Sequence, residues 1–119
     1  MKNFRKLKVW QQSHQFVLAL YPLTKSFPND ELYGLTSQLR RSAVSIPSNI
    51  AEGCGRQGDA ELGRFCQIAM GSASEAEYQL ELARDLEFLP EKSYASLNDN
   101  LLEIKKMLNG LIKKLNANR

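Results

Sequence analysis

The chain has 119 residues, of which 43% are hydrophobic and 24% are charged, and its formal net charge is +3. This balance is typical of one globular domain and excludes a low-complexity disordered chain. The longest apolar run, residues 16–21, is far shorter than the roughly 20 residues of a membrane-spanning helix. The basic start leads into Gln11, Gln12 and Ser13 rather than into an apolar stretch, so we expect no secretory signal and a cytoplasmic location.

Helical spacing of apolar residues occurs four times, and no alternating pattern long enough for a strand occurs. The first predicted helix spans residues 6–25 and contains Pro22 near its end. The connector at residues 27–30 follows it. Asn29 and Asp30 in this connector are suited to cap the next helix.

The second predicted helix spans residues 30–56, and its apolar positions step by threes and fours. The pattern continues through Pro47, which predicts a kink rather than an end. Gly53, Gly55 and Gly58 then stop the helix. These glycines match the letters of a dinucleotide-binding fingerprint, but that fingerprint requires a preceding strand, and here a helix precedes them.

The third predicted helix begins at Asp59 and ends near Phe88, and the fourth begins near Pro90 and carries a heptad seam. Because the connectors are short, the economical architecture is an all-α, antiparallel up-down-up-down four-helix bundle with a proline-kinked second helix. We expect residues 1–119 to form a single domain.

The sequence offers little for catalysis or metal binding. It contains one histidine, His14, and two cysteines, Cys54 and Cys66, which are too few for a zinc site or a disulfide framework. We expect the cysteines to be small buried hydrophobic residues in a reducing compartment. The sequence therefore predicts no catalytic residue, no metal, no cofactor, no small-molecule substrate and no enzyme.

The charge is distributed unevenly along the chain. Residues 1–10 carry four positive and no negative charges, residues 58–91 have a net charge of −6, and residues 92–119 have +4. Neighbouring basic and acidic helices could neutralise one another. Alternatively, basic surfaces could collect anions such as nucleic-acid phosphates.

A polar stripe lies beside the apolar stripe of the second predicted helix, with small serines at its centre. Small polar residues at helical spacing allow close helix contact, so this stripe fits a buried network, a plain surface, a ligand-facing wall or a subunit interface. We assign the last of these as a prediction: the interface candidates are Gln38, Arg41, Ser45, Ser48, Asn49 and Glu52.

The stretch QLRRSAVSIPSNIAEGCGR at residues 38–56 resembles the signature of the 23S ribosomal RNA intervening-sequence proteins. The resemblance extends to both sides of this stretch. Before it lie Trp10 and residues 27–35, and after it lie Arg64-Phe65 and residues 68–75. A group related to this family serves as accessory proteins of diversity-generating retroelements. One departure is Ser42, where the family more often has alanine.

This resemblance implies a bacterial four-helix bundle, assembled as a ring-like homopentamer, with a nucleic-acid-binding role and no catalytic residues. We therefore predict a non-enzymatic oligomer that binds RNA or DNA phosphates through a basic surface. The candidate binding residues are Lys6, Lys8, Arg40, Arg41, Arg56 and Arg64. The alternative is a protein–protein interaction scaffold without a nucleic-acid role. No membrane association is expected.

Overall fold

The protein is an all-α four-helix bundle, as the sequence predicts. The computed structural model describes residues 2–118, and no strand occurs within them. The helices are α1 (Lys8–Thr24), α2 (Leu35–Gly55), α3 (Asp59–Asp85) and α4 (Glu91–Ala117), with short 3-10 turns η1 (Phe4–Lys6) and η2 (Asn29–Glu31). None of these helices is long and apolar enough to cross a membrane.

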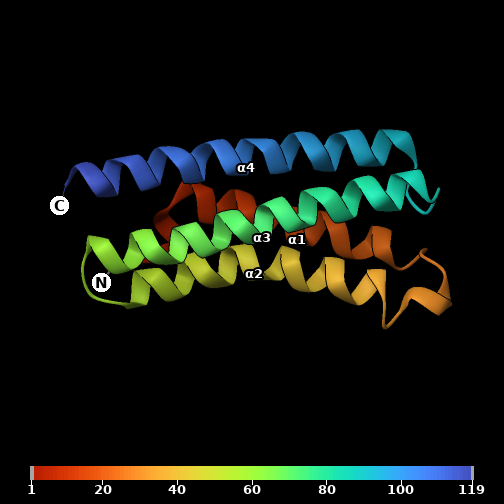
Figure 1. The fold of residues 1–119 in the computed structure, drawn as a ribbon, viewed down its shortest axis with the longest axis horizontal. Helices are drawn as coiled ribbons and strands as arrows, with labels where there is room; N and C mark the ends of the chain where they lie inside the picture. The colour runs from red at the N-terminus through yellow and green to blue at the C-terminus, as the bar shows by residue number, and fades with distance from the viewer. Residues whose placement is uncertain (1, 119) are drawn as a thin grey trace.

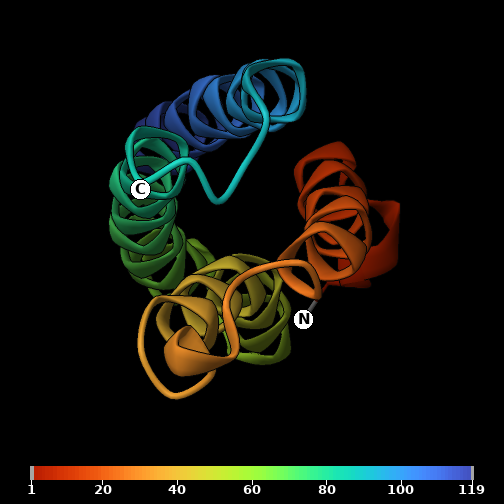
Figure 2. The ribbon, with the colours of Figure 1, turned by 90° about the vertical axis from the view of Figure 1, so that its right-hand side faces the viewer.

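The four helices lie side by side along the longest dimension of the molecule, which measures 46 Å (Figure 1). Each helix runs opposite to the one before it, as the colour gradient shows. Viewed along the bundle, the helices follow one another around the core in chain order (Figure 2). Both termini therefore lie at the same end of the bundle, and the connectors α1–α2 and α3–α4 lie at the other end.

The tightest packing is between α2 and α3. The core face of α3 carries the small residues Ala69, Ala73 and Ala76, all fully buried, which let the backbone of α2 come close. The contact is closest at Gly53, where an added Cβ would lie 2.8 Å from the Cβ of Phe65. This close approach explains why a glycine occupies a buried position near the end of α2.

The start of α2 differs from the sequence prediction. The helix begins at Leu35 rather than at residue 30, because Gly34 has φ −111° and ψ −116°, which are not helical angles. Neither Asn29 nor Asp30 caps it. Instead, Oε1 of Glu31 accepts a hydrogen bond from the backbone N–H of Leu35 at 3.0 Å.

The other helix limits lie close to the predicted ones. α2 is continuous through Pro47, which is buried. α3 ends at Asp85, three residues before the predicted limit, because Glu87 adopts a left-handed conformation with φ 63°. The backbone N–H of Phe88 then donates to the carbonyl of Ala83 at 2.9 Å, which closes the helix end.

Candidate nucleic-acid interface

The first residues of the chain are fixed across the end of α2. The backbone N–H of Lys2 donates to the carbonyl of Cys54 at 3.0 Å. The Asn3 side chain accepts from the N–H of Arg5 at 3.1 Å, and the Gln11 amide donates to the Arg5 carbonyl at 2.8 Å. The basic N-terminal segment therefore has a defined position against the bundle.

Aromatic contacts support the same segment. The rings of Phe4 and Trp10 lie 4.9 Å apart, and Trp10 stacks on His14 at 5.0 Å with an angle of 12° between the ring planes. The Arg5 guanidinium lies 4.4 Å from the centre of the Phe4 ring. The single histidine thus contributes to packing.

Two acid-free stretches of the sequence meet at the end of the bundle that holds both termini. Residues 2–29 contain five cations and no acid, and residues 104–118 contain four lysines and no acid. The start of the chain and the end of α4 lie at this end (Figure 1). We call the exposed, unpaired cations of these two stretches in the half of the bundle that holds the termini the basic end: Lys2, Arg5, Lys6, Lys8, Lys106, Lys113 and Lys114.

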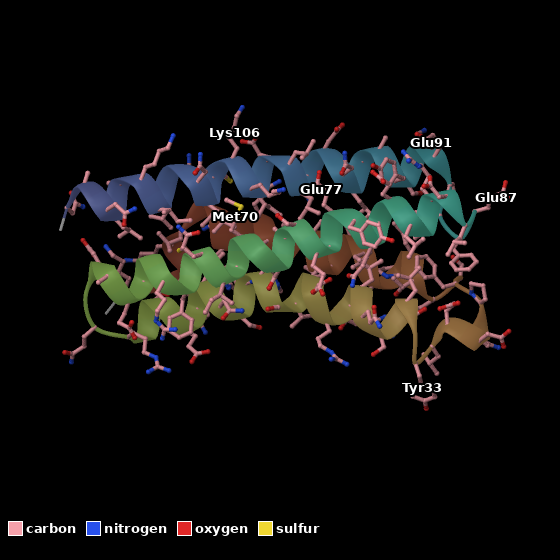
Figure 3. All side chains as sticks on the ribbon, in the orientation of Figure 1. Tyr33, Met70, Glu77, Glu87, Glu91 and Lys106 are labelled. Atoms are coloured by element: carbon pink, nitrogen blue, oxygen red, sulfur yellow. The ribbon has the colours of Figure 1, made fainter. Side chains whose placement is uncertain are left out.

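Most acidic residues lie away from the basic end, but Glu52, Asp59 and Glu61 flank the α2–α3 turn near it. Figure 3 places Glu87 and Glu91 at the opposite end of the molecule, whereas Lys106 points outward from α4 in the half that holds the termini. Among the ion pairs of residues 2–118, only Lys105–Glu77, at 2.7 Å, joins two helices. Neutralisation between neighbouring helices is therefore slight.

The predicted binding residues occupy different surroundings. Lys6 and Lys8 are exposed and belong to the basic end. Arg41 is exposed on α2. Arg40 is half-buried, with its Nε donating to the hydroxyl of Thr24 at 2.8 Å. The adjacent arginines therefore differ in exposure but line one groove, and both lie away from Lys6 and Lys8.

Arg56 and Arg64 lie near the α2–α3 turn and each forms an exposed ion pair. Arg56 contacts Glu52 at 2.9 Å, and Arg64 contacts Glu61 at 3.0 Å. The hydrogen bond from Arg64 lowers the pKa of the Glu61 carboxyl group. Exposed pairs of this kind contribute little stability, so a phosphate could replace either carboxylate at small cost.

The polar stripe of α2 divides into two parts. Ser45 and Asn49 are half-buried: the Ser45 hydroxyl lies 2.8 Å from that of Ser72 on α3, and the Asn49 amide donates to the Ser45 carbonyl at 2.8 Å. The Ser45–Ser72 contact holds α2 against α3 within one chain, and the Asn49 amide bonds within α2. The remaining interface candidates are exposed: Gln38, Arg41, Ser48 and Glu52.

Beside this exposed part lies an apolar groove that sequence reasoning missed. One section, of about 600 Å³, is lined by Tyr21, Leu32 and Tyr33 together with residues of α2, and Tyr33 is 93% exposed. A second section, of about 310 Å³, includes Trp10 and Pro47 and shares Val44 and Ser48 with the first. The exposed face of α2 is therefore bordered by unusually accessible apolar surface.

The described residues contain no cluster suited to a metal ion. No group of three or more His, Cys, Asp or Glu side chains comes together within residues 2–118. Cys54 and Cys66 are buried free thiols. Burial raises the pKa of Cys66 to about 11, so this thiol is protonated and a poor nucleophile at neutral pH.

Sequence reasoning also missed five members of the basic end: Lys2, Arg5, Lys106, Lys113 and Lys114. The signal in the sequence that could have indicated them is the absence of acids from residues 2–29 and 104–118. Their meeting at one end depends on the antiparallel arrangement of all four helices, which brings the last residues of α4 back beside the first residues of the chain.

Comparisons with known proteins agree with this architecture. Residues 5–110 match the family described as 23S rRNA-intervening sequence protein. A crystal structure of a protein of unknown function from the S23 ribosomal protein family of Bacteroides thetaiotaomicron VPI-5482 is 33% identical, with a TM-score of 0.81, over 88% of this chain and 98% of that one. No curated protein matches the chain. The chain therefore belongs to the family of 23S rRNA-intervening sequence proteins.

Proposed function

We propose that this protein is a non-enzymatic, cytoplasmic, homo-oligomeric bundle that binds RNA or DNA through phosphate contacts from the basic end. One observation carries the proposal: two acid-free stretches, distant in sequence, supply seven exposed and unpaired cations to the half of the bundle that holds the termini.

The proposed contact is electrostatic. Each lysine or arginine that approaches a phosphate releases a condensed counterion, so affinity falls steeply as salt rises. The η1 segment is fixed by its hydrogen bonds, which reduces the entropy lost when its cations meet a ligand. Arg56 and Arg64, near the same end, could join by exchanging their exposed carboxylate partners for phosphate.

We further propose that copies associate through the exposed face of α2 and the apolar groove beside it. The accessible apolar side chains there, including Tyr33 at 93% exposure and Leu32 at 47%, would be covered in an assembly. Association also multiplies the basic ends. A ring of five copies would carry a formal charge of +15, because each copy carries +3.

Fluorescence anisotropy with a labelled RNA hairpin across a salt series tests nucleic-acid binding. Replacing Lys106, Lys113 and Lys114 with glutamine should lower the slope of log affinity against log salt by about 2 to 3, since each phosphate contact contributes roughly 0.7 to 0.9. The control replaces Lys92, which is exposed but lies toward the other end, with glutamine and should leave the slope unchanged.

Absence of binding at low salt would overturn the nucleic-acid proposal. The interaction-scaffold alternative predicts a protein partner that persists after nuclease treatment, together with no salt-sensitive RNA binding.

For self-association, Ser48→Arg places a long cation in both sections of the groove and should convert the assembly to 13.5 kDa monomers in light scattering. Ser96→Arg, exposed on α4, is the control. A wild-type monomer at micromolar concentration would refute association.

A further inference from the structure

Arg40 is the one half-buried cation in residues 2–118 that lacks a carboxylate partner. Three cationic side chains there are half-buried: Arg40, Arg84 and Lys105. Arg84 pairs with Asp85 at 3.0 Å, and Lys105 pairs with Glu77 at 2.7 Å. Partly desolvated charges are normally paired, so an unpaired guanidinium in this position requires an explanation.

The surroundings hold Arg40 in place without neutralising it. Its Nε donates to the Thr24 hydroxyl at 2.8 Å, and that hydroxyl donates to the carbonyl of Tyr21 at 2.8 Å. The guanidinium also lies 4.9 Å from the centre of the Tyr21 ring. Its remaining N–H groups have no acceptor among residues 2–118. The guanidinium is therefore held in position while these N–H groups are free to donate to a ligand.

A small pocket lies beside this guanidinium, where the α1–α2 connector meets α2. It has a volume of about 220 Å³, and Arg40, Lys25, Thr24, Asn29 and Thr36 contribute its polar lining. No acidic side chain lines it. The lining thus combines two cations, two hydroxyls and an amide, which are the donor types that bind oxyanions.

Thr36 supplies a second, independent observation. Its side chain is 3% exposed, and its hydroxyl oxygen has no hydrogen-bond partner among the described residues. A buried hydroxyl without a partner is costly and uncommon. Thr36 lies one helical turn before Arg40 on α2, so both residues belong to the same face of the helix and line the same pocket.

We propose that this pocket binds a compact oxyanion, a phosphate dianion or a phosphate monoester, through the Arg40 guanidinium and the Thr36 hydroxyl. The anion would supply the missing counter-charge, and a turn of the Thr36 side chain toward the pocket would give its shielded hydroxyl a hydrogen-bond partner. Acids near this end, including Glu87 and Glu91, disfavour a long polyanion there, which separates this pocket from the basic end.

The acids nearest in sequence do not compete for the guanidinium. Glu31 accepts the backbone N–H of Leu35 through Oε1, and Asp30 is exposed on η2. Neither residue lines the pocket. The pocket and the basic end lie at opposite ends of the bundle, so the proposal stands or falls independently of nucleic-acid binding.

An NMR titration of the amide signals with inorganic phosphate tests the proposal, with chloride adjusted to keep ionic strength constant. We expect saturable shifts at Thr36, Arg40 and the connector. Thr36→Val should weaken binding about tenfold, the expected loss of one hydrogen bond to a charged ligand. Arg40→Met should weaken it further. Lys92→Met, which alters an exposed cation at the same end of the bundle but outside the pocket, should bind as the wild type does.

Thr36→Val keeps the side-chain shape and removes the unpartnered hydroxyl, so it should fold at least as stably as the wild type without phosphate. Shifts that stay linear with concentration, shifts confined to the basic end, or unchanged binding by Thr36→Val would overturn the proposal. Phenyl phosphate distinguishes the source: equal or tighter binding indicates a phosphorylated molecule, whereas binding of inorganic phosphate alone indicates the free anion.

Discussion

At the scale of single residues, two glycines in similar helical settings should respond oppositely to alanine. A Cβ at Gly53 would lie 2.8 Å from the Phe65 Cβ and 3.0 Å from Leu62 Cδ1, whereas nothing lies within 4 Å of a Cβ at Gly71. Gly53→Ala forces α2 and α3 apart and should destabilise the protein by about 1–3 kcal/mol. Gly71→Ala should stabilise it by about 0.5–1 kcal/mol, because alanine is the better helix former.

Urea denaturation followed by circular dichroism measures both changes. The pair controls for the loss of backbone freedom that any Gly→Ala change brings to the unfolded chain. If Gly53→Ala were as stable as Gly71→Ala, the close α2–α3 contact would be wrong.

Cys66 predicts a stability change in alkaline solution. Burial raises the pKa of its thiol to about 11, above the ordinary value of 9.0. A raised pKa means that the unfolded chain loses this proton first as pH increases. The contribution of the protonated Cys66 thiol to the free energy of unfolding is therefore complete below about pH 9. It is lost as pH rises towards 11, and the total loss is about 2–3 kcal/mol.

Chemical denaturation from pH 8 to pH 11 should show this decline, and Cys66→Ala should show a flatter curve. The difference between the two curves removes the contribution of lysines and tyrosines that titrate in the same range. Parallel curves would show that Cys66 is not responsible.

At the scale of helices, the start of α2 and the end of α3 differ most from the sequence prediction, and each depends on a single residue. Glu31 accepts the first free N–H of α2, and its charge lies at the positive end of that helix. Glu31→Ala should cost about 0.5–2 kcal/mol in the free energy of unfolding. Asp30→Ala, which removes an exposed neighbour that forms no such bond, should change stability by less. Thermal and urea unfolding compare the two.

The end of α3 should be improved by a glycine. Glu87 occupies the left-handed position after the helix with φ 63°, where a side chain is unfavourable. Glu87→Gly removes that strain and should stabilise the protein by about 1 kcal/mol, in contrast to the usual effect of introducing glycine. Glu81→Gly, within the exposed face of α3, should destabilise it by a similar amount in the same urea assay.

These helix ends show what the sequence could and could not predict. Apolar periodicity, Asp59 and Pro90 predicted the number of helices and the start of α3 and α4 correctly, because those signals are local. Asn29 and Asp30 are equally good caps in isolation, and only the backbone angles of Gly34 move the start of α2 to Leu35.

At the scale of the whole molecule, prediction failed where residues distant in sequence come together. The basic end joins the N-terminal segment to the last turns of α4, and no local pattern connects them. The phosphate pocket depends on the hydroxyl of Thr36 lacking a partner, which is a property of packing alone. The family resemblance predicted the fold, but it could not locate either surface.

The bundle should also be least stable along α1. This helix has 17 residues and buries five, of which Ser13 and Thr24 are polar, whereas α2 and α3 bury ten residues each. Less buried apolar surface means that less free energy opposes local opening. In native-state hydrogen exchange, amides of α1 should therefore exchange at least about tenfold faster than the core amides of α2 and α3. Equal rates would indicate a single cooperative unit.

The same measurement connects this mobility to binding. Opening of α1 would carry Lys6 and Lys8 away from Lys113 and Lys114, so a ligand that bridges these lysines binds only the closed bundle. By linkage, RNA should slow exchange in residues 8–12 and 105–117, with the effect disappearing at high salt. Phosphate should instead slow exchange around Thr36. RNA protection confined to the connector at residues 24–36 would contradict the assignment of nucleic acid to the basic end.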